Sequence, residues 1–517
     1  MTKIITAEEA VKIIKDNHTI AVSGFCGFGA PEELLVEIEK RFLKTGSPKY
    51  LTVMNCAGCG DGKDRGMNHF GNEGMVRKVY CGHIGLAPKL GRLVAENKAE
   101  GYCVPQGVTV HILRAIAGKK PGVLTHVGLR TFADPRLEGC KTNAISHEEV
   151  VRLLNIDEKD YLFYKAFPID VALIRGTTSD ERGNITMEKE ALFLEQLLMA
   201  QAAKNSGGIV IAQVERIAKY GTLRPKEVKV PGVFVDYVVT ASPENHCQSF
   251  AYDTYNESWS GELKIPLEGL GTIPLNERKI CARRASMELR PNDIVNLGIG
   301  VSEGVSNIAS EEGFSNELTL TIEAGTIGGI PAGGLGIGAS YNPDAIIEQC
   351  FQFDFYDGGG IDVAFLGMAQ VDKEGNVNVS KFNGRVVGPG GFINITQNAK
   401  RVVFCGTFTA GGLKVSTGDG RLKIVNEGRQ IKFKELVDQI TFSGRYAFET
   451  GQKIMYITER AVFENGRDGL VLTEIAPGVD LQKDILNNME FKPIVSENLK
   501  LMKENIFRNE PMGIAIS

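Results

Sequence analysis

The sequence contains the same pattern twice, and this repeat constrains the fold more than any other feature. The stretch FPIDVALIRGTTSDERGNITM at 167–187 reappears as GGIDVAFLGMAQVDKEGNVNV at 359–379, with a constant offset of 192 residues. Each copy reads as a buried strand, a polar turn and a second strand. The shared positions include Asp170 and Asp362, Asp180 and Asp372, and Gly183-Asn184 and Gly375-Asn376. A fixed offset over such a stretch indicates a duplicated structural unit.

Two further pairs follow the same order along the chain. LTVMNCAGCG at 51–60 matches LTLTIEAGTIG at 318–328 with an offset of 267, and TIAVSGF at 19–25 matches DIVNLGI at 293–299 with an offset of 274. Strands alternate with helical patterns, which is typical of an α/β domain. Chance similarity between ordinary strand-turn-helix units would not keep three pairs in order. We therefore predict two tandem, related α/β domains, each with a largely parallel sheet flanked by helices.

The length of the chain agrees with two domains, because 517 residues exceed what a single hydrophobic core supports. The decreasing offsets place the larger insertions in the first copy. The polar, aperiodic stretch 241–276, which holds the only tryptophan, Trp259, is the expected junction. We predict an N-terminal domain at 1–275 and a C-terminal domain at 276–517.

Composition limits the partners. The hydrophobic content of 43% and the charged content of 23% are typical of a globular protein, and a net charge of −5 without a long basic run argues against nucleic acid. The start, MTKIITAEEAVKIIKDN, has a helical rather than a signal-peptide pattern, and no apolar run reaches the ~18 residues of a membrane span. Ten scattered cysteines favour reduced thiols. We expect a cytoplasmic protein with no nucleic-acid or membrane partner.

One position differs between the copies in a way that points to chemistry. In TIEAGTIGGIPAGG at 321–334, Glu323 precedes a series of glycines, whereas Cys56 holds the matching position in the first copy. The shared loop is scaffold, so an acid found in only one copy is a candidate functional residue. Glycine makes up 60 of the 517 residues, about 12% against a usual ~7%. These glycines are clustered, which indicates sites lined by backbone.

A lone carboxylate can act as a base, a metal ligand, an ion-pair partner or a nucleophile. Metal binding is disfavoured because the nearest acids are distant and none of the seven histidines has HExxH spacing, and Cys56 and Cys59 form a single CxxC without a second pair. No Lys or Arg lies between residues 318 and 342 to form a local ion pair. A surface acid on a turn stays possible. Neighbouring glycine N–H groups, which can stabilise an oxyanion, suit nucleophilic attack on a carbonyl.

Further stretches surround this loop in a characteristic order. They are SGFCGFGAPEELL, PQGVTVHILRAIAGKKPGV, AFPIDVALIRG, VNLGIGVSEGV, QFDFYDGGGIDVAFLGMAQVDKEGNVNVSKF, GPGGFINITQNAKRVVFCGTFTAGGL and YITERAVFE. Together with the Glu-small-Gly element and GGIP, they resemble the family I CoA-transferases, most closely the acetate/propionate CoA-transferases, nearly from end to end. Close relatives often have Ser after the catalytic Glu, where this chain has Ala324.

This resemblance implies an enzyme that moves CoA from a short-chain acyl-CoA, such as acetyl-CoA or propionyl-CoA, to a short-chain carboxylate. Glu323 would attack the thioester and become a glutamyl-CoA thioester in a ping-pong cycle. The family has two α/β domains of one topology, fused here and supplied as two subunits in other members. Relatives assemble as dimers or tetramers, which implies a homodimer or homotetramer for this chain. CoA and acyl-CoA are substrates here, and neither a permanently bound cofactor nor a metal is implied.

The same resemblance assigns roles to six more residues. The glutamine approaches the catalytic carboxylate, the GPGG glycines face the reaction centre with the asparagine as an oxyanion donor, and the GFCGFG glycines line the acyl pocket. These residues are Gln106, Gly390, Gly391, Asn378, Gly27 and Gly29. Two rival functions stay open, namely an acyl-CoA hydrolase and a non-catalytic acyl-CoA or metabolite-binding module. The preferred acid also stays open.

Overall fold

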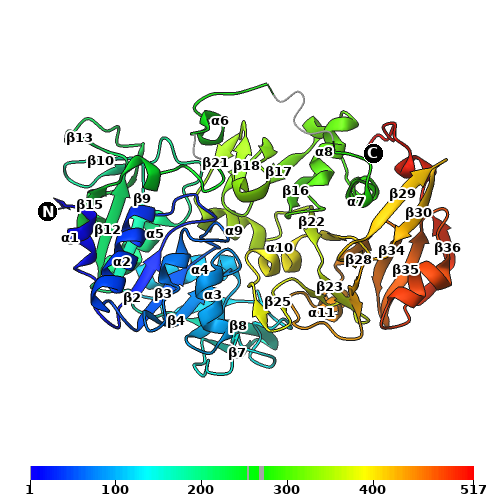
Figure 1. Cartoon of the computed structure of the whole chain (residues 1–517), viewed down its shortest axis with the longest axis horizontal. Coiled ribbons are helices and arrows are strands. Elements are labelled where there is room, and N and C mark those ends of the chain that lie inside the picture. Colours follow the sequence, from blue (N-terminus) through cyan, green and yellow to red (C-terminus); the bar gives the residue numbers. More distant parts are fainter. Residues whose placement is uncertain (1, 253–254, 267–272, 517) are drawn as a thin grey trace.

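The computed structural model describes residues 2–252, 255–266 and 273–516. Two large sheets, one in each half of the molecule, lie side by side along its long axis (Figure 1). The strands of the first sheet come from residues up to Thr240, and those of the second from Ile294 onward. The predicted α/β class is confirmed. The division at 275/276 falls between the two sets of strands and stays a prediction.

The first sheet has eight strands, and every neighbouring pair is parallel. Two of its central strands, Val171–Arg175 and Leu51–Asn55, are buried along their whole length, as expected for a parallel sheet covered on both faces. The order across the sheet is β1 (Lys3–Ile4), β15 (Tyr237–Thr240), β12 (Ile209–Val214), β9 (Val171–Arg175), β2 (Thr19–Val22), β3 (Leu51–Asn55), β4 (Val76–Cys81) and β5 (Glu100–Cys103).

The second sheet has ten strands and a parallel centre, with antiparallel pairs beginning on both sides of it. Its order is β21 (Ala345–Ile346), β18 (Thr326–Ile327), β17 (Thr319–Thr321), β16 (Ile294–Leu297), β22 (Val363–Gly367), β27 (Arg401–Cys405), β33 (Lys453–Ile457), β34 (Ala461–Gly466), β35 (Gly469–Ile475) and β36 (Ile494–Leu501). The series β15-β12-β9-β2-β3 thus has its counterpart in β33-β27-β22-β16-β17, which supports the predicted duplication.

Helices pack around these sheets. They are α1 (Ala7–Val11), α2 (Glu32–Thr45), α3 (Pro88–Ala95), α4 (Gln106–Ala117), α5 (Gln196–Asn205), α6 (Glu257–Ser260), α7 (Glu277–Ser286), α8 (Gly304–Glu311), α9 (Gln349–Asp357), α10 (Phe392–Asn398) and α11 (Gly444–Glu449). The helical pattern expected at the start of the chain is realised only in α1. Thr6 and Glu9 form a capping box there, and the preceding residues instead form the edge strand β1, which pairs with β15.

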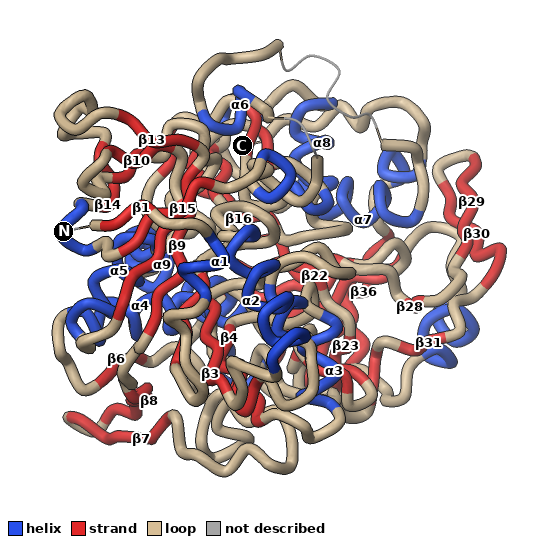
Figure 2. Tube along the Cα trace, turned by 60° about the vertical axis from the view of Figure 1, so that its left-hand side comes forward, coloured by secondary structure: helices blue, strands red, loops and turns tan. Residues whose placement is uncertain are grey.

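Short strands form hairpins and small sheets around the two halves; β7–β8 and β29–β30 extend outward (Figure 2). These strands are β6 (Gly122–Thr125), β7 (Val151–Ile156), β8 (Lys159–Lys165), β10 (Thr178–Asp180), β11 (Ile185–Thr186), β13 (Arg216–Ala218), β14 (Val228–Val230), β19 (Ile330–Pro331), β20 (Ser340–Tyr341), β23 (Gln370–Asp372), β24 (Val377–Asn378), β25 (Lys381–Phe382), β26 (Arg385–Val386), β28 (Thr409–Ala410), β29 (Lys414–Gly418), β30 (Arg421–Asn426), β31 (Gln430–Ile431) and β32 (Phe433–Lys434).

The strand registers test the repeat residue by residue. Val53 and Leu320 hold equivalent positions, so the match of Cys56 with Glu323 three residues later is confirmed. The third pair was misaligned by one residue. Ile20 pairs with Val171 just as Val295 pairs with Val363, which makes that offset 275 rather than 274.

The turns of the repeat are also alike. Asp180 accepts hydrogen bonds from the backbone N–H of Asn184 and from its side chain, and Asp372 accepts the same pair from Asn376. The aspartate therefore stabilises the polar turn in both copies.

The predicted junction is more structured than its composition suggested. Residues 253–254 and 267–272 of this stretch lie outside the described residues. Trp259, in α6, is buried and makes edge-to-face contacts with Phe28 of the first half and Tyr341 of the second. This aromatic contact joins the two halves rather than separating them.

Candidate active site

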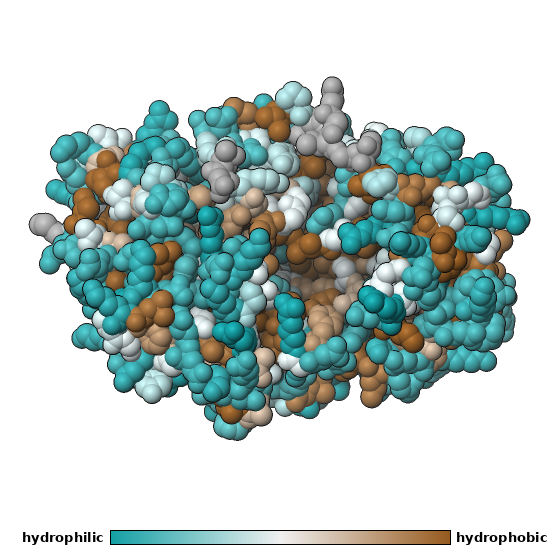
Figure 3. Space-filling model, viewed as in Figure 1, coloured by the Kyte–Doolittle hydropathy of each residue, from teal (hydrophilic) through white to brown (hydrophobic). Residues whose placement is uncertain are grey.

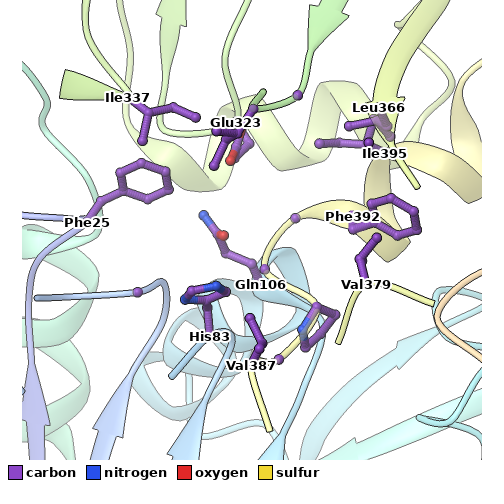
Figure 4. A pocket seen from close by; sticks show the side chains of 18 of the residues that line it. Phe25, His83, Gln106, Glu323, Ile337, Leu366, Val379, Val387, Phe392 and Ile395 are labelled. Atoms are coloured by element: carbon purple, nitrogen blue, oxygen red, sulfur yellow. The ribbon is translucent and has the colours of Figure 1, made fainter. Parts of the chain in front are cut away.

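The carboxyl ends of strands from both sheets meet at one cavity, the usual location of ligand sites in parallel sheets. Its volume is about 250 Å³, and a hollow with apolar side chains is visible over this part of the molecule (Figure 3). Its polar side chains are His83, Gln106, Asn296 and Glu323. Its apolar walls include Phe25, Leu86, Ile337, Leu366, Val379, Val387, Phe392 and Ile395 (Figure 4).

Glu323 stands at the tip of the turn between β17 and β18 and lines the cavity. The Ile322 N–H donates to the Thr326 carbonyl over 2.9 Å and closes this turn. Gly325 has a φ of +114°, and a Cβ there would lie 2.1 Å from the Ile347 carbonyl oxygen, so only glycine fits. The glycine after the acid thus allows the tight turn that presents it.

Burial raises the pKa of Glu323 above its usual range, and hydrogen bonding from the Asn296 side chain offsets part of this rise. Asn296 also donates from Nδ2 to the Tyr356 hydroxyl over 3.2 Å, and that hydroxyl donates to Thr321 Oγ1 over 2.9 Å. By strand register, Asn296 matches Ala21 of the first copy. The second half therefore has an asparagine beside its acid where the first half has a methyl group.

Gln106 comes from the first half, as the first residue of α4, and its amide points into the cavity near Glu323 (Figure 4). Its Nε2 is buried and has no hydrogen-bond partner within the described chain. The start of α4 is docked on the second half, because the Gln106 N–H donates to the Gly390 carbonyl over 2.9 Å and the Gly107 N–H donates to Asn394 Oδ1 over 3.1 Å. These bonds hold Gln106 in the lining of the same cavity as Glu323.

Gly390 and Gly391 both line the cavity, but their N–H groups differ. The Gly390 N–H donates to the Gly82 carbonyl over 2.8 Å, so it is already engaged. Gly391 has no such bond to the described residues and lies directly against the Glu323 side chain, where a Cβ would come within 3.2 Å of the Glu323 Cγ. The structure thus supports Gly391, rather than Gly390, as a backbone donor beside the acid.

Three predicted site residues are not brought into the cavity. Asn378 is fully buried, and its Nδ2 donates to Gln370 Oε1 and to the Lys381 carbonyl, so this amide stabilises its own loop. Gly27 packs on the backbone of Phe250, and Gly29 packs on the Leu194 side chain.

The glycine loop does contribute to the site through the residues beside these glycines. Phe25 and Cys26 line the cavity, and mutual backbone hydrogen bonds between Phe25 and Phe28 close the loop. Burial, together with the nearby Glu323 charge, raises the pKa of Cys26 to about 12, so its thiol stays protonated at neutral pH.

Sequence reasoning missed the polar residue His83. It lies two residues after the end of β4 and lines the cavity below Gln106 (Figure 4). The available signal was its place directly after a strand of a parallel sheet, where ligand-binding side chains gather. Desolvation lowers the pKa of His83 to about 4, so the imidazole is neutral at neutral pH.

The two halves differ at the helix that faces the acid position. Gly391 precedes α10 and leaves space beside Glu323, whereas Glu195 precedes α5 and lies close enough to influence the Cys56 thiol. Burial raises the pKa of Glu195 to about 8. The first half therefore has a buried acid just before this helix, where the second half has a glycine packed against Glu323.

The described ranges contain no group of three or more His, Cys, Asp or Glu side chains placed to hold a metal ion. All ten cysteines are free, and Cys56 and Cys59 are buried. No helix in the described part of the chain is both long and apolar enough to cross a membrane.

Comparisons with known proteins agree with this geometry. Residues 4–241 match the Coenzyme A transferase family. A caffeate CoA-transferase of Acetobacterium woodii is 50% identical, with 99% of both chains covered, and the acetate CoA-transferase YdiF of Escherichia coli K12 is 44% identical over 99% of this chain and 96% of its own.

The fold has a close counterpart among solved structures. The acyl-CoA transferase YdiF of Escherichia coli O157:H7, in a thioester complex with CoA, has a TM-score of 0.95 and 43% identity, covering 100% of this chain and 98% of its own. With a near-identical fold and this identity over almost the whole length, the chain belongs to the coenzyme A transferase family and is a CoA-transferase that acts on acyl-CoA and carboxylates.

Proposed function

We propose that the enzyme transfers CoA in a ping-pong cycle through a thioester on Glu323. A Glu323 carboxylate oxygen attacks the acyl-CoA carbonyl carbon, the carbon–sulfur bond breaks, and an acyl-glutamyl anhydride and CoA thiolate form. The thiolate then attacks the glutamyl carbonyl, which releases the first acid and leaves glutamyl-CoA. The second carboxylate reverses both steps and departs as acyl-CoA, and Glu323 returns unchanged.

The observation that carries this proposal is Glu323, a carboxylate facing the cavity without a cationic partner among the described residues. Poor solvation makes a carboxylate a better nucleophile than it is in water. The Gly391 N–H and the Gln106 amide are the donors available for the developing oxyanion. The YdiF structure in a thioester complex with CoA supports the same intermediate here.

The test is to trap the intermediate. After incubation with acyl-CoA and no acceptor, the wild type should gain the mass of CoA less one water at Glu323, and borohydride should reduce that residue. Glu323→Gln should lose transfer while keeping its melting temperature. A wild type that transfers CoA without this adduct, or a fully active Glu323→Gln, would overturn the mechanism.

We propose short-chain acids such as acetate and propionate as substrates, since one relative is named for acetate and the cavity is small and largely apolar. Another relative is named for caffeate, so a panel of acceptors must include an aromatic acid. Free CoA release without an acceptor would favour the hydrolase alternative. We also propose a homodimer or homotetramer, to be checked by light scattering.

A further inference from the structure

His83 is a polar residue of the cavity that has no role in the proposed cycle. It follows β4 in the first half, and its ring faces the cavity on the same side as Gln106, across from Glu323 (Figure 4). Its side chain makes no hydrogen bond or ion pair with any residue that the structure describes. An imidazole has one donor and one acceptor when neutral, so both are available to a ligand.

Glycines leave the space that the His83 ring occupies. A Cβ at Gly58 would come within 2.6 Å of the His83 Nδ1, and a Cβ at Gly85 would come within 2.9 Å of its Cε1. At Gly388, a Cβ would lie 3.0 Å from the His83 Cα. Two glycines therefore pack against the ring and a third against the backbone of His83, which fixes the position of the side chain although it has no polar partner. Gly58, from the unexplained CxxC segment, thereby acquires a role.

The charge state of the ring limits what it can bind. Desolvation keeps the imidazole neutral at neutral pH, so His83 does not form an ion pair with a carboxylate there. The matching group is an uncharged oxygen that donates or accepts a hydrogen bond. Leaving a polar group unpaired in a closed apolar pocket is costly, which makes such a site discriminate between ligands with and without that oxygen.

The cavity has a closed end and an open end. Phe25 and Cys26 are only 6% and 4% exposed, whereas Ile299, which also lines the cavity, is 61% exposed. The long CoA chain must reach Glu323 from the open side. The acyl group is on the other side of the thioester from the CoA chain, so it lies at the closed end with Phe25, Cys26 and His83. This step rests on the proposed function.

We propose that His83 determines acyl specificity by a neutral hydrogen bond to a hydroxyl or keto oxygen on the acyl chain. Oxygen-bearing acids are then preferred over alkyl acids of the same length. This hydrogen bond gives the imidazole a polar partner, and the mechanism of attack by Glu323 stays the same. His83 acts on the identity of the acid and not on the thioester exchange.

The experiment compares kcat/KM for matched acceptors, butyrate against 3-hydroxybutyrate and propionate against lactate, with one acyl-CoA donor. The wild type should prefer the oxygen-bearing member of at least one pair. His83→Phe should lower that preference about tenfold, whereas His83→Asn, which keeps a neutral donor and acceptor, should retain part of it. Leu86→Val, a change of volume alone in the same wall, should not lower the ratio.

The outcomes separate the two proposals. An unchanged ratio in His83→Phe, or an equal fall for both members of each pair, overturns the role of His83. Absence of transfer with every acid contradicts the proposed function instead. In that case the binding of butyrate and 3-hydroxybutyrate, measured by calorimetry on wild type and His83→Phe, still tests whether the ring recognises the oxygen.

Discussion

Gly391 lies against the side chain of Glu323, so closely that a Cβ at residue 391 would come within 3.2 Å of the Glu323 Cγ and 3.3 Å of the Ile395 Cδ1. The backbone of Gly391 has a φ of −78°, which any residue adopts, so the need for glycine here is spatial. Gly391→Ala should displace the Glu323 carboxylate by a few tenths of an ångström. We expect kcat to fall about 10- to 100-fold, because attack geometry is sensitive to such displacements.

The matched control is Gly418→Ala, since a Cβ at residue 418 meets no atom within 4 Å. Both variants should keep the wild-type melting temperature within a few degrees, and only Gly391→Ala should lose turnover. Equal kcat values in the two variants would contradict a tight fit between Gly391 and the nucleophile.

The activity should have an acidic limit set by Glu323. Burial raises its pKa above the ordinary value of 4.5, so the nucleophilic carboxylate is lost at a higher pH than for an exposed glutamate. Asn296→Ala removes a hydrogen bond that lowers this pKa and should move the limit to still higher pH. Ala21 at the matching position of the first sheet indicates that the scaffold tolerates alanine.

The measurement is kcat/KM from pH 4.5 to 8 at a fixed donor concentration. Tyr356→Phe is the control, because it removes the hydroxyl that accepts from Asn296 while keeping the asparagine. Its acidic limit should shift less than that of Asn296→Ala. A limit that moves to lower pH in Asn296→Ala would contradict the sign argued here.

The repeat predicted the architecture well because strand patterns and turn aspartates are local signals. It also marked Glu323 as a candidate functional residue, because the equivalent position of the first copy holds Cys56. The strand registers confirm that alignment. It did not predict His83, which joins the same cavity from 240 residues away through the docking of α4 on α10. No periodicity encodes such a contact. The position of Asn378 was not predicted either, because the sequence does not tell whether a polar side chain at the end of a strand faces a cavity or bonds to its own neighbours, as this one does.

Glu195 should make the stability depend on pH. Burial raises its pKa to about 8 from an ordinary 4.5, so the folded state keeps a proton that the unfolded state releases above 4.5. The associated stability is fully present below pH 4.5 and is lost as the pH rises toward 8. Glu195→Gln stays neutral throughout, so its melting temperature should fall less than that of the wild type between pH 5 and 8.

Thermal scans at pH 5, 6, 7 and 8 provide the measurement, with Glu96→Gln as the matched change at an exposed position. The melting temperature of Glu195→Gln minus that of the wild type should become more positive as the pH rises. The same difference for Glu96→Gln should stay constant. A constant difference for Glu195→Gln would mean that Glu195 is ionised in the folded protein at neutral pH.

Gln106 should act on the transition state rather than on binding. Its Nε2 is buried without a described partner and points into the cavity, where it can donate to the carbonyl oxygen as that atom gains charge (Figure 4). Gln106→Ala should lower kcat about 100-fold with a smaller change in KM, since loss of one oxyanion donor has this magnitude. Gln106→Glu should be at least as impaired, because it removes the donor and adds a second carboxylate near Glu323.

Both variants keep the backbone hydrogen bond to Gly390, so unchanged melting temperatures would exclude the loss of α4 docking as the cause. A wild-type kcat in Gln106→Ala would show that the amide has no part in the reaction.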